Sequence, residues 1–224
     1  MTRQAPSPNQ DDRPPAIPID TLILHYSGMQ SAEAAIARLR DPVARVSSHY
    51  VVEEDGLVWQ LVPEGRRAWH AGVSHWRGHT GLNDRSIGIE IVNPGHEWGY
   101  RSFPMLQMAA LCELCLGILA AHPIPARNVV GHSDVAPDRK QDPGELFDWR
   151  GLAANGVGFW PTTDLAPALS NAREGLTAIG YRTDLDLGLV LTAFQRHWRP
   201  GRIDGIENPD TLAMLATVAG GIGR

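Results

Sequence analysis

The sequence of 224 residues has little of what marks several large classes of protein. Its two cysteines cannot form a disulfide framework, and it has no run of about 18 apolar residues that would cross a membrane. Its formal net charge is -5, so it lacks the excess of basic residues that binding to nucleic-acid phosphates needs. We therefore expect neither nucleic acid nor a membrane as a partner. The hydrophobic share of 43% is close to that of ordinary folded domains, so most of the chain should enclose a core.

The first 20 residues lack an apolar stretch as well. They are polar and rich in proline, and they contain neither a secretory signal nor a cysteine for lipid attachment. We predict a flexible lead-in over residues 1–20 and, if Met1 is the native start, a cytoplasmic protein. At roughly 100–200 residues per domain, the length allows one large domain, or a medium domain followed by a small one.

Hydrophobic periodicity divides the rest of the chain into two parts. Up to about Pro161, short apolar or β-branched runs alternate with helical patterns, which is typical of an α/β domain over 21–161. After that point the apolar positions have helical spacing alone, which predicts a small three-helix unit over 164–224. About sixty residues bury little core alone, so we expect this unit to pack partly on the larger domain.

Local patterns locate the individual elements. Asp55 followed by Gly56 between two β-branched runs predicts a hairpin, and the segment 69–84, rich in Gly, His and Trp without a period, should be a loop. The other expected elements are strands at 21–26, 86–92 and 129–132 and helices at 31–39 (capped by Ser31), 105–121, 164–179, 187–198 and 209–218.

Nine histidines are unusual for this length, and two of them combine with a carboxylate. His25, His132 and Asp142 lie at the end of an expected strand or in the loop behind one. Two neutral imidazoles and one carboxylate form a plausible set of three zinc ligands that leaves a fourth position for water. A histidine satisfied by the backbone is the more frequent case on spacing alone, so both interpretations stay open. The two cysteines lie in an apolar stretch and are expected in the core.

Five segments together resemble the type 2 family of zinc-dependent N-acetylmuramoyl-L-alanine amidases, in the order typical of that family. They are 24–27 (LHYS), 68–72 (AWHAG), 83–90 (NDRSIGIE), 131–134 (GHSD) and 137–144 (PDRKQDPG). The resemblance covers about residues 21–160. It implies a mixed central β-sheet with helices on both faces, the fold of peptidoglycan recognition proteins, and a zinc ion in a surface groove.

The resemblance also implies roles for single residues. The zinc ligands would be His25, His132 and Asp142, so neither cysteine would be a ligand. Glu90 matches the family's catalytic glutamate and would carry a proton from water to the leaving amine. Lys140 matches the catalytic lysine and would stabilise the developing oxyanion. The residues that match the lining of the family's substrate groove are Trp69, His70, Asn83 and Arg85.

Other polar side chains have weaker assignments. Arg66 and Arg67, like Arg85, could meet the carboxylates of a stem peptide or could be solvated loop residues. His49 could support the site from behind or act as a packing residue. The histidines expected to be exposed in loops are His75, His79 and His96.

The C-terminal part resembles a peptidoglycan-binding-like three-helix domain. The resemblance is carried by 176–181 (LTAIGY), 193–198 (AFQRHW) and 203–205 (IDG), followed by Thr211. The usual glycine before Thr211 is missing, which puts binding by this domain in doubt more than its fold. A purely structural role is the alternative.

The activity implied by the resemblance is hydrolysis of the amide between N-acetylmuramic acid, or its 1,6-anhydro form, and L-alanine of the stem peptide. Two other classes of function stay open: a non-catalytic muropeptide-binding protein of the same fold, and a metal-dependent hydrolase of some other amide. The presence of all three ligand candidates with Glu90 and Lys140 favours the amidase. A cytoplasmic amidase, expected to be a monomer, would act on soluble fragments in peptidoglycan recycling.

Overall fold

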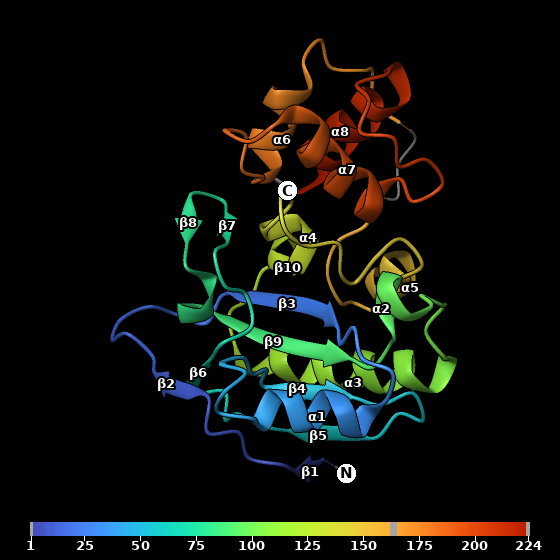
Figure 1. The fold of residues 1–224 in the computed structure, drawn as a ribbon. Helices are drawn as coiled ribbons and strands as arrows, with labels where there is room; N and C mark the ends of the chain where they lie inside the picture. The colour runs from blue at the N-terminus through green and yellow to red at the C-terminus, as the bar shows by residue number, and fades with distance from the viewer. Residues whose placement is uncertain (1, 162–164, 223–224) are drawn as a thin grey trace.

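A six-stranded β-sheet forms the centre of the computed structural model, which describes residues 2–161 and 165–222 (Figure 1). In sheet order, the strands are β1 (Arg3–Gln4), β5 (Val58–Gln60), β4 (Tyr50–Val52), β9 (Ser86–Ile91), β3 (Thr21–Tyr26) and β10 (Val129–Gly131). β4 and β5 are antiparallel and form the hairpin expected around Gly56, whereas the other neighbouring strands are parallel. The mixed α/β sheet predicted from the sequence is confirmed.

Helices cover both faces of the sheet. α3 (Met105–Ala121) packs on one face and α1 (Ala32–Arg40) on the other, because successive strand side chains point to opposite sides. On β4, Val52 is buried in the cluster with α3 and Val51 in the cluster with α1. The isoleucines of β9 face α3. Glu90 therefore points to the opposite face of the sheet.

Several expected elements are confirmed with little change in their bounds. β3, α1 and α3 lie where apolar runs and helical periodicity predicted them, and the Ser31 hydroxyl caps α1 by accepting the N–H of Ala34 at 3.2 Å. The segment expected to be a loop instead contains a hairpin and a 3-10 turn. The shorter elements are β7 (His75–Trp76), β8 (His79–Thr80), η1 (Leu82–Asp84), α2 (Gly95–Trp98), η2 (Ala126–Asn128), α4 (His132–Val135) and α5 (Trp149–Ala154).

The prediction of a flexible lead-in over residues 1–20 is wrong for the described residues. β1 pairs with β5, and β2 (Gln10–Asp12) pairs antiparallel with β6 (Arg66–Ala68). Polar side chains anchor this arm: the hydroxyl of Ser7 donates to the carbonyl of Leu39, and the buried Asn9 amide donates to two further carbonyls. Hydrogen bonds to distant backbone groups cannot be predicted from a polar, proline-rich composition.

Three helices form the C-terminal part at the top of Figure 1: α6 (Ala172–Ile179), α7 (Leu187–Trp198) and α8 (Pro209–Ile222). α7 has its expected bounds. α6 begins later than expected, because the Asn171 side chain accepts the N–H of Arg173 and caps the helix there. The first residue of the expected helix, Asp164, lies outside the described residues.

The C-terminal helices share a hydrophobic core with the α/β part. Ile23 and Val130 of the sheet and Val135 of α4 are buried in one cluster with Leu176 of α6 and Phe194 of α7. The expected packing of the helical unit on the larger domain is therefore observed. Across residues 2–161 and 165–222, no helix has the length and apolar character needed to cross a bilayer.

Candidate metal centre and active site

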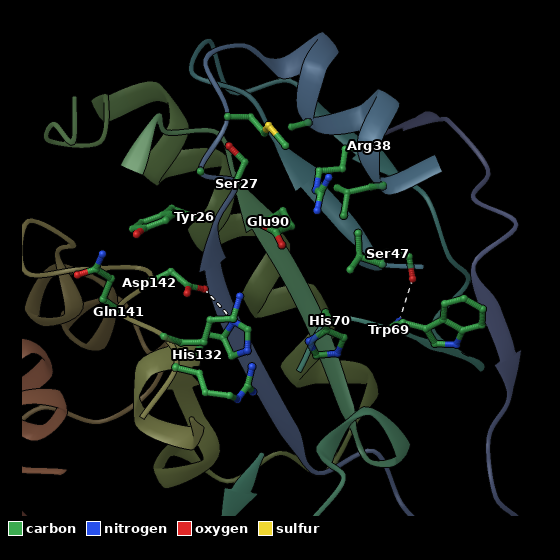
Figure 2. A pocket seen from close by; sticks show the side chains of 17 residues that line it. Tyr26, Ser27, Arg38, Ser47, Trp69, His70, Glu90, His132, Gln141 and Asp142 are labelled. Carbon is green, nitrogen blue, oxygen red and sulfur yellow. Dashed lines mark hydrogen bonds and ion pairs between the residues drawn. The ribbon is translucent and has the colours of Figure 1, made fainter. Parts of the chain in front are cut away.

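Two imidazoles and one carboxylate converge beside the end of β3. Figure 2 shows two of these residues, His132 and Asp142. His25 lies on β3, His132 is the first residue of α4, and Asp142 lies in the loop after α4. The Nδ1 atoms of the two histidines are 2.9 Å apart. Asp142 Oδ2 lies 3.1 Å from His25 Nδ1 and 3.0 Å from His132 Nδ1. All three residues are buried, so the structure brings the predicted ligand set together.

A backbone hydrogen bond closes the loop between His132 and Asp142. The N–H of Ser133 donates to the carbonyl of Asp142 at 2.9 Å. The N–H groups of Arg139 and Lys140 both donate to the carbonyl of Ala136 at 3.0 Å, which tightens the turn. This explains how ligands ten residues apart in the sequence can meet without sharing a helix face.

Hydrogen bonds on the far side of each ring fix the tautomers of the two histidines. His132 Nε2 lies 3.2 Å from the carbonyl of Ala71, which can only accept, so Nε2 carries the proton. His25 Nε2 lies 3.0 Å from His70 Nδ1, and His70 Nε2 lies 3.1 Å from the hydroxyl oxygen of Ser86. The Ser86 hydroxyl donates to a carbonyl, so His70 donates to Ser86 and accepts from His25. Both Nδ1 lone pairs therefore face Asp142.

Electrostatics keep these groups in their metal-binding forms. Burial, reinforced by the neighbouring His132, lowers the pKa of His25 to about 4. Burial works against the charge on Asp142, but the two imidazoles outweigh it and hold the pKa of this carboxyl below its usual range. Three lone-pair atoms about 3 Å apart repel one another unless a cation lies between them. The described residues thus form a site suited to a metal ion.

Glu90 lies next to His25 on the same face of the sheet. The two residues are register partners on β9 and β3. Oε2 of Glu90 is buried and has no hydrogen-bond partner among the described residues, and Figure 2 shows the carboxyl pointing into the pocket. Burial raises the pKa of the Glu90 carboxyl well above its ordinary value, the charge of Asp142 adds to the rise, and Lys140 opposes it. A carboxyl with a raised pKa can exchange a proton near neutral pH.

A pocket of about 330 Å³ contains this carboxyl, two of the ligands and the exposed Lys140. Its volume is within the range of small-molecule sites. The pocket residues that the sequence did not single out include Tyr26, Ser27, Arg38, Ser47 and Gln141. Arg38 lies in the last turn of α1, where a basic residue is expected to stabilise the helix end, so its sequence position gave no signal.

The predicted groove residues separate into two groups. Trp69 and His70 line the pocket. Asn83 and Arg85 do not: the Asn83 side chain accepts backbone N–H groups, and Arg85 forms an ion pair with Asp20. Arg66 and Arg67 are likewise outside the pocket, in ion pairs with acidic side chains. The structure therefore gives no support to substrate contacts by these four residues.

Two further histidines considered from the sequence, His49 and His96, have defined partners. His49 is buried behind the site, where Nδ1 accepts the N–H of Gly88 at 3.0 Å. His96 was expected to be exposed, but it is half-buried between Tyr26 and Glu145. Its neighbours come from other elements, so local spacing could not identify them.

A mixed sheet that presents this ligand set beside a buried carboxyl and a lysine has the features of a metal-dependent hydrolase. The family model described as N-acetylmuramoyl-L-alanine amidase matches residues 15–145. The chain belongs to this family.

Individual relatives extend over more of the chain. It is 37% identical to N-acetylmuramoyl-L-alanine amidase AmiD of Escherichia coli over 225 residues, which cover 88% of this chain and 80% of AmiD. A solved complex of AmiD with the substrate anhydro-N-acetylmuramic acid-L-Ala-D-gamma-Glu-L-Lys has a TM-score of 0.81 at 35% identity, and covers 94% of this chain and 92% of AmiD. AmpDH3 from Pseudomonas aeruginosa, in complex with anhydromuramic pentapeptide, also has a TM-score of 0.81, at 31% identity over 94% of this chain and 96% of AmpDH3.

Proposed function

We propose that the protein is a zinc-dependent amidase that cleaves the bond between the muramic acid residue of a muropeptide and L-alanine of the stem peptide. The observation that carries the proposal is the buried Glu90 carboxyl, whose Oε2 has no hydrogen-bond partner in residues 2–161 and 165–222 and which faces the same pocket as the histidine–histidine–aspartate set. A protein that only bound muropeptides would have no use for a buried carboxyl held in this way. The relatives named above support the substrate class.

Zinc is the metal that fits the ligand set best. Ligands at 2.0–2.2 Å from a tetrahedral zinc ion lie roughly 3.3–3.5 Å from one another. The three candidate atoms are 2.9–3.1 Å apart, so small side-chain movements suffice. A zinc ion held by His25, His132 and Asp142 would polarise the amide carbonyl and lower the pKa of water toward about 7.

The protein's own groups then have separate tasks. Glu90 accepts a proton from the attacking water and delivers it to the nitrogen of L-alanine as the carbon–nitrogen bond breaks. The Lys140 ammonium stabilises the negative charge that develops on the carbonyl oxygen. Trp69 offers an apolar ring to the substrate at the edge of the pocket. Arg38, exposed at the pocket wall, is suited to a carboxylate of the stem peptide.

We further propose that the substrates are soluble fragments with 1,6-anhydro ends and that the enzyme works in cytoplasmic recycling. The substrates named in the two solved complexes carry anhydro ends, which supports the first part. Fractionation of cells that make the native protein tests the location, and recovery from the periplasm or an outer membrane would refute it. We also propose a division into an amidase unit at 21–161 and a peptidoglycan-binding-like unit at 164–224, supported by the grouping of α6, α7 and α8 (Figure 1).

Mass spectrometry of reaction products tests the activity. Purified muropeptides with and without the 1,6-anhydro end are incubated with the zinc-loaded protein. We expect release of an intact stem peptide that begins with L-alanine, and faster release from the anhydro form. Binding without cleavage would support the non-catalytic alternative, and cleavage at another amide would contradict the assigned bond.

A further inference from the structure

We propose that Asn83 is a positioning residue that holds the hydrogen-bond partners of both metal-ligating histidines. The sequence placed Asn83 in the substrate groove, but its side chain lies outside the pocket. The inference rests on the zinc site proposed above. It gives Asn83 a role in supporting zinc binding and not in contacting the substrate.

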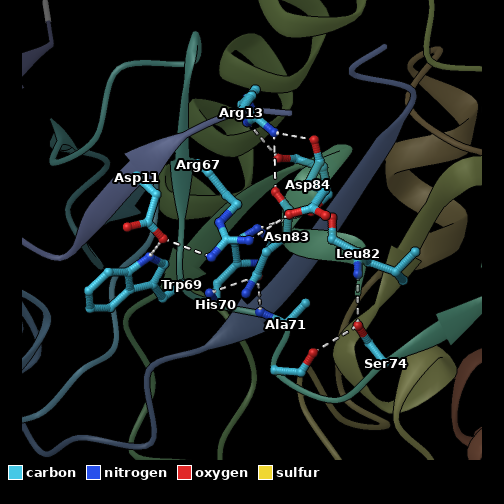
Figure 3. A network of polar contacts seen from close by, with 12 residues as sticks. Asp11, Arg13, Arg67, Trp69, His70, Ala71, Ser74, Leu82, Asn83 and Asp84 are labelled. Carbon is cyan, nitrogen blue, oxygen red and sulfur yellow. Dashed lines mark hydrogen bonds and ion pairs between the residues drawn. The ribbon is translucent and has the colours of Figure 1, made fainter. Parts of the chain in front are cut away.

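The Asn83 side chain accepts a pair of hydrogen bonds from one turn of backbone (Figure 3). Asn83 Oδ1 accepts the N–H of His70 at 3.1 Å and the N–H of Ala71 at 2.8 Å. Both partners are donors, which identifies the oxygen of the amide. One side-chain atom therefore fixes the position of the His70–Ala71 peptide.

The two residues joined by that peptide, His70 and Ala71, each form a hydrogen bond with one of the candidate ligands. The Ala71 carbonyl accepts the proton of His132 Nε2, and the His70 ring accepts the proton of His25 Nε2. A change in the position of this peptide therefore affects both histidines together. Each ring must keep its tautomer and direction for Nδ1 to face the metal.

The His70 ring lies against the backbone of Gly88. A Cβ atom at Gly88 would lie 2.4 Å from the His70 ring, so the ring occupies space that only glycine leaves free on β9. The ring is also held by the hydroxyl of Ser86. The position of the ring therefore depends on the space at Gly88 and on the hydrogen bond to Ser86.

Asn83 is itself held by an arginine from the N-terminal arm. Arg13 donates to the backbone carbonyls of Asn83 at 3.2 Å and Asp84 at 3.1 Å. It also donates to the carbonyls of Glu64 and Ser86, so its guanidinium joins three segments of the chain. The Asn83 side chain is thus presented from a fixed turn, as a positioning role requires.

The test compares zinc affinity among full-length variants by competition with a chelator. Asn83→Leu removes the acceptor, and we expect zinc to bind about 10–100-fold more weakly, the range typical of lost partners of metal ligands. Asn83→Asp keeps an acceptor oxygen for both backbone N–H groups and replaces the amide N–H₂ group by a charged carboxylate oxygen, so it should bind zinc within about threefold of wild type. Asn128→Leu is the matched control. This half-buried asparagine directly precedes β10, at the end of the strand remote from His132, and donates to the carbonyl of Asp20.

The outcomes separate this inference from the proposed function. Wild-type zinc affinity in a folded Asn83→Leu variant, or a loss of more than about tenfold in folded Asn83→Asp, would overturn the positioning role. An Asn83→Asp variant with normal zinc affinity but a raised KM would show that the amide contacts substrate, and would also overturn it. If Asn83→Leu does not fold, the Asn83→Asp result still decides. Failure of the wild type to bind zinc would instead refute the proposed function.

Discussion

Replacement of Glu90 by glutamine tests the proposed proton transfer with the smallest change in shape. Glutamine has the same size but cannot take a proton from water. Because Oε2 of Glu90 has no hydrogen-bond partner among the described residues, the substitution removes no stabilising contact of that atom. It also removes a carboxyl that burial disfavours in its charged form. We therefore expect the free energy of unfolding to fall by less than about 1 kcal/mol.

The effect on catalysis should be much larger than the effect on stability. Loss of a general base or acid slows a reaction by about 10²–10⁴, which raises the activation free energy by about 2.7–5.5 kcal/mol. The metal ligands are untouched, so the zinc content should stay near one per chain. KM should change little, because the lost interaction belongs to the transition state.

The assay measures kcat and KM on a purified anhydro-muropeptide by chromatography, together with zinc content and urea unfolding. Glu113→Gln is the control, since this exposed glutamate lies on α3, across the sheet from the pocket. A zinc-loaded, folded Glu90→Gln variant with kcat/KM within about threefold of wild type would show that Glu90 moves no proton.

Three further predictions concern the metal, the joint between the two parts, and pH. Removal of zinc by a chelator should abolish activity and lower thermal stability, since free zinc at 100 times its Kd adds about 2.7 kcal/mol; unchanged melting would contradict this. Tyr181→Phe should destabilise the protein by about 1–3 kcal/mol in urea unfolding, because the buried Asp134 carboxylate loses a 2.6 Å hydrogen bond; an equal stability would count against it. Burial, with the charge of Arg13, lowers the pKa of His49 to about 3. As the pH falls below 6.5, the His49 imidazole therefore binds a proton in the unfolded chain but not in the folded one. Zinc-free protein should therefore lose up to about 1.4 kcal/mol per pH unit between pH 6.5 and 3 through His49. A His49→Gln variant with the wild-type slope in urea unfolding would refute that assignment.

Many strands and helices, and the candidate metal ligands, could be identified from the sequence because their signals are local. A continuous apolar run defines β3, and helical periodicity defines α7. His25, His132 and Asp142 were found because each lies within a short recognisable segment. The structure adds the distances that make them one site.

The features that sequence analysis missed depend on contacts between distant segments. The N-terminal arm is held by Asn9, whose amide reaches carbonyls more than thirty residues away, so its polar composition was misleading. The direction of the Asn83 side chain follows from the turn that Arg13 holds. Arg38 faces the pocket only because α1 packs over β4, on the face of the sheet to which Glu90 points. None of these relations has a period or spacing that a single sequence can show.

The core shared by the two parts has a consequence for the protein's synthesis. Ile23, Val130 and Val135 are buried together with residues of α6 and α7, which leave the ribosome only after the whole α/β part has been made. Until then, an apolar face of the nascent chain stays uncovered, and such a face favours aggregation or chaperone binding. We therefore expect premature termination after residue 161 to yield an aggregation-prone product that is rapidly degraded, and not a small active enzyme. The C-terminal helices complete the core of the part that carries the candidate metal ligands.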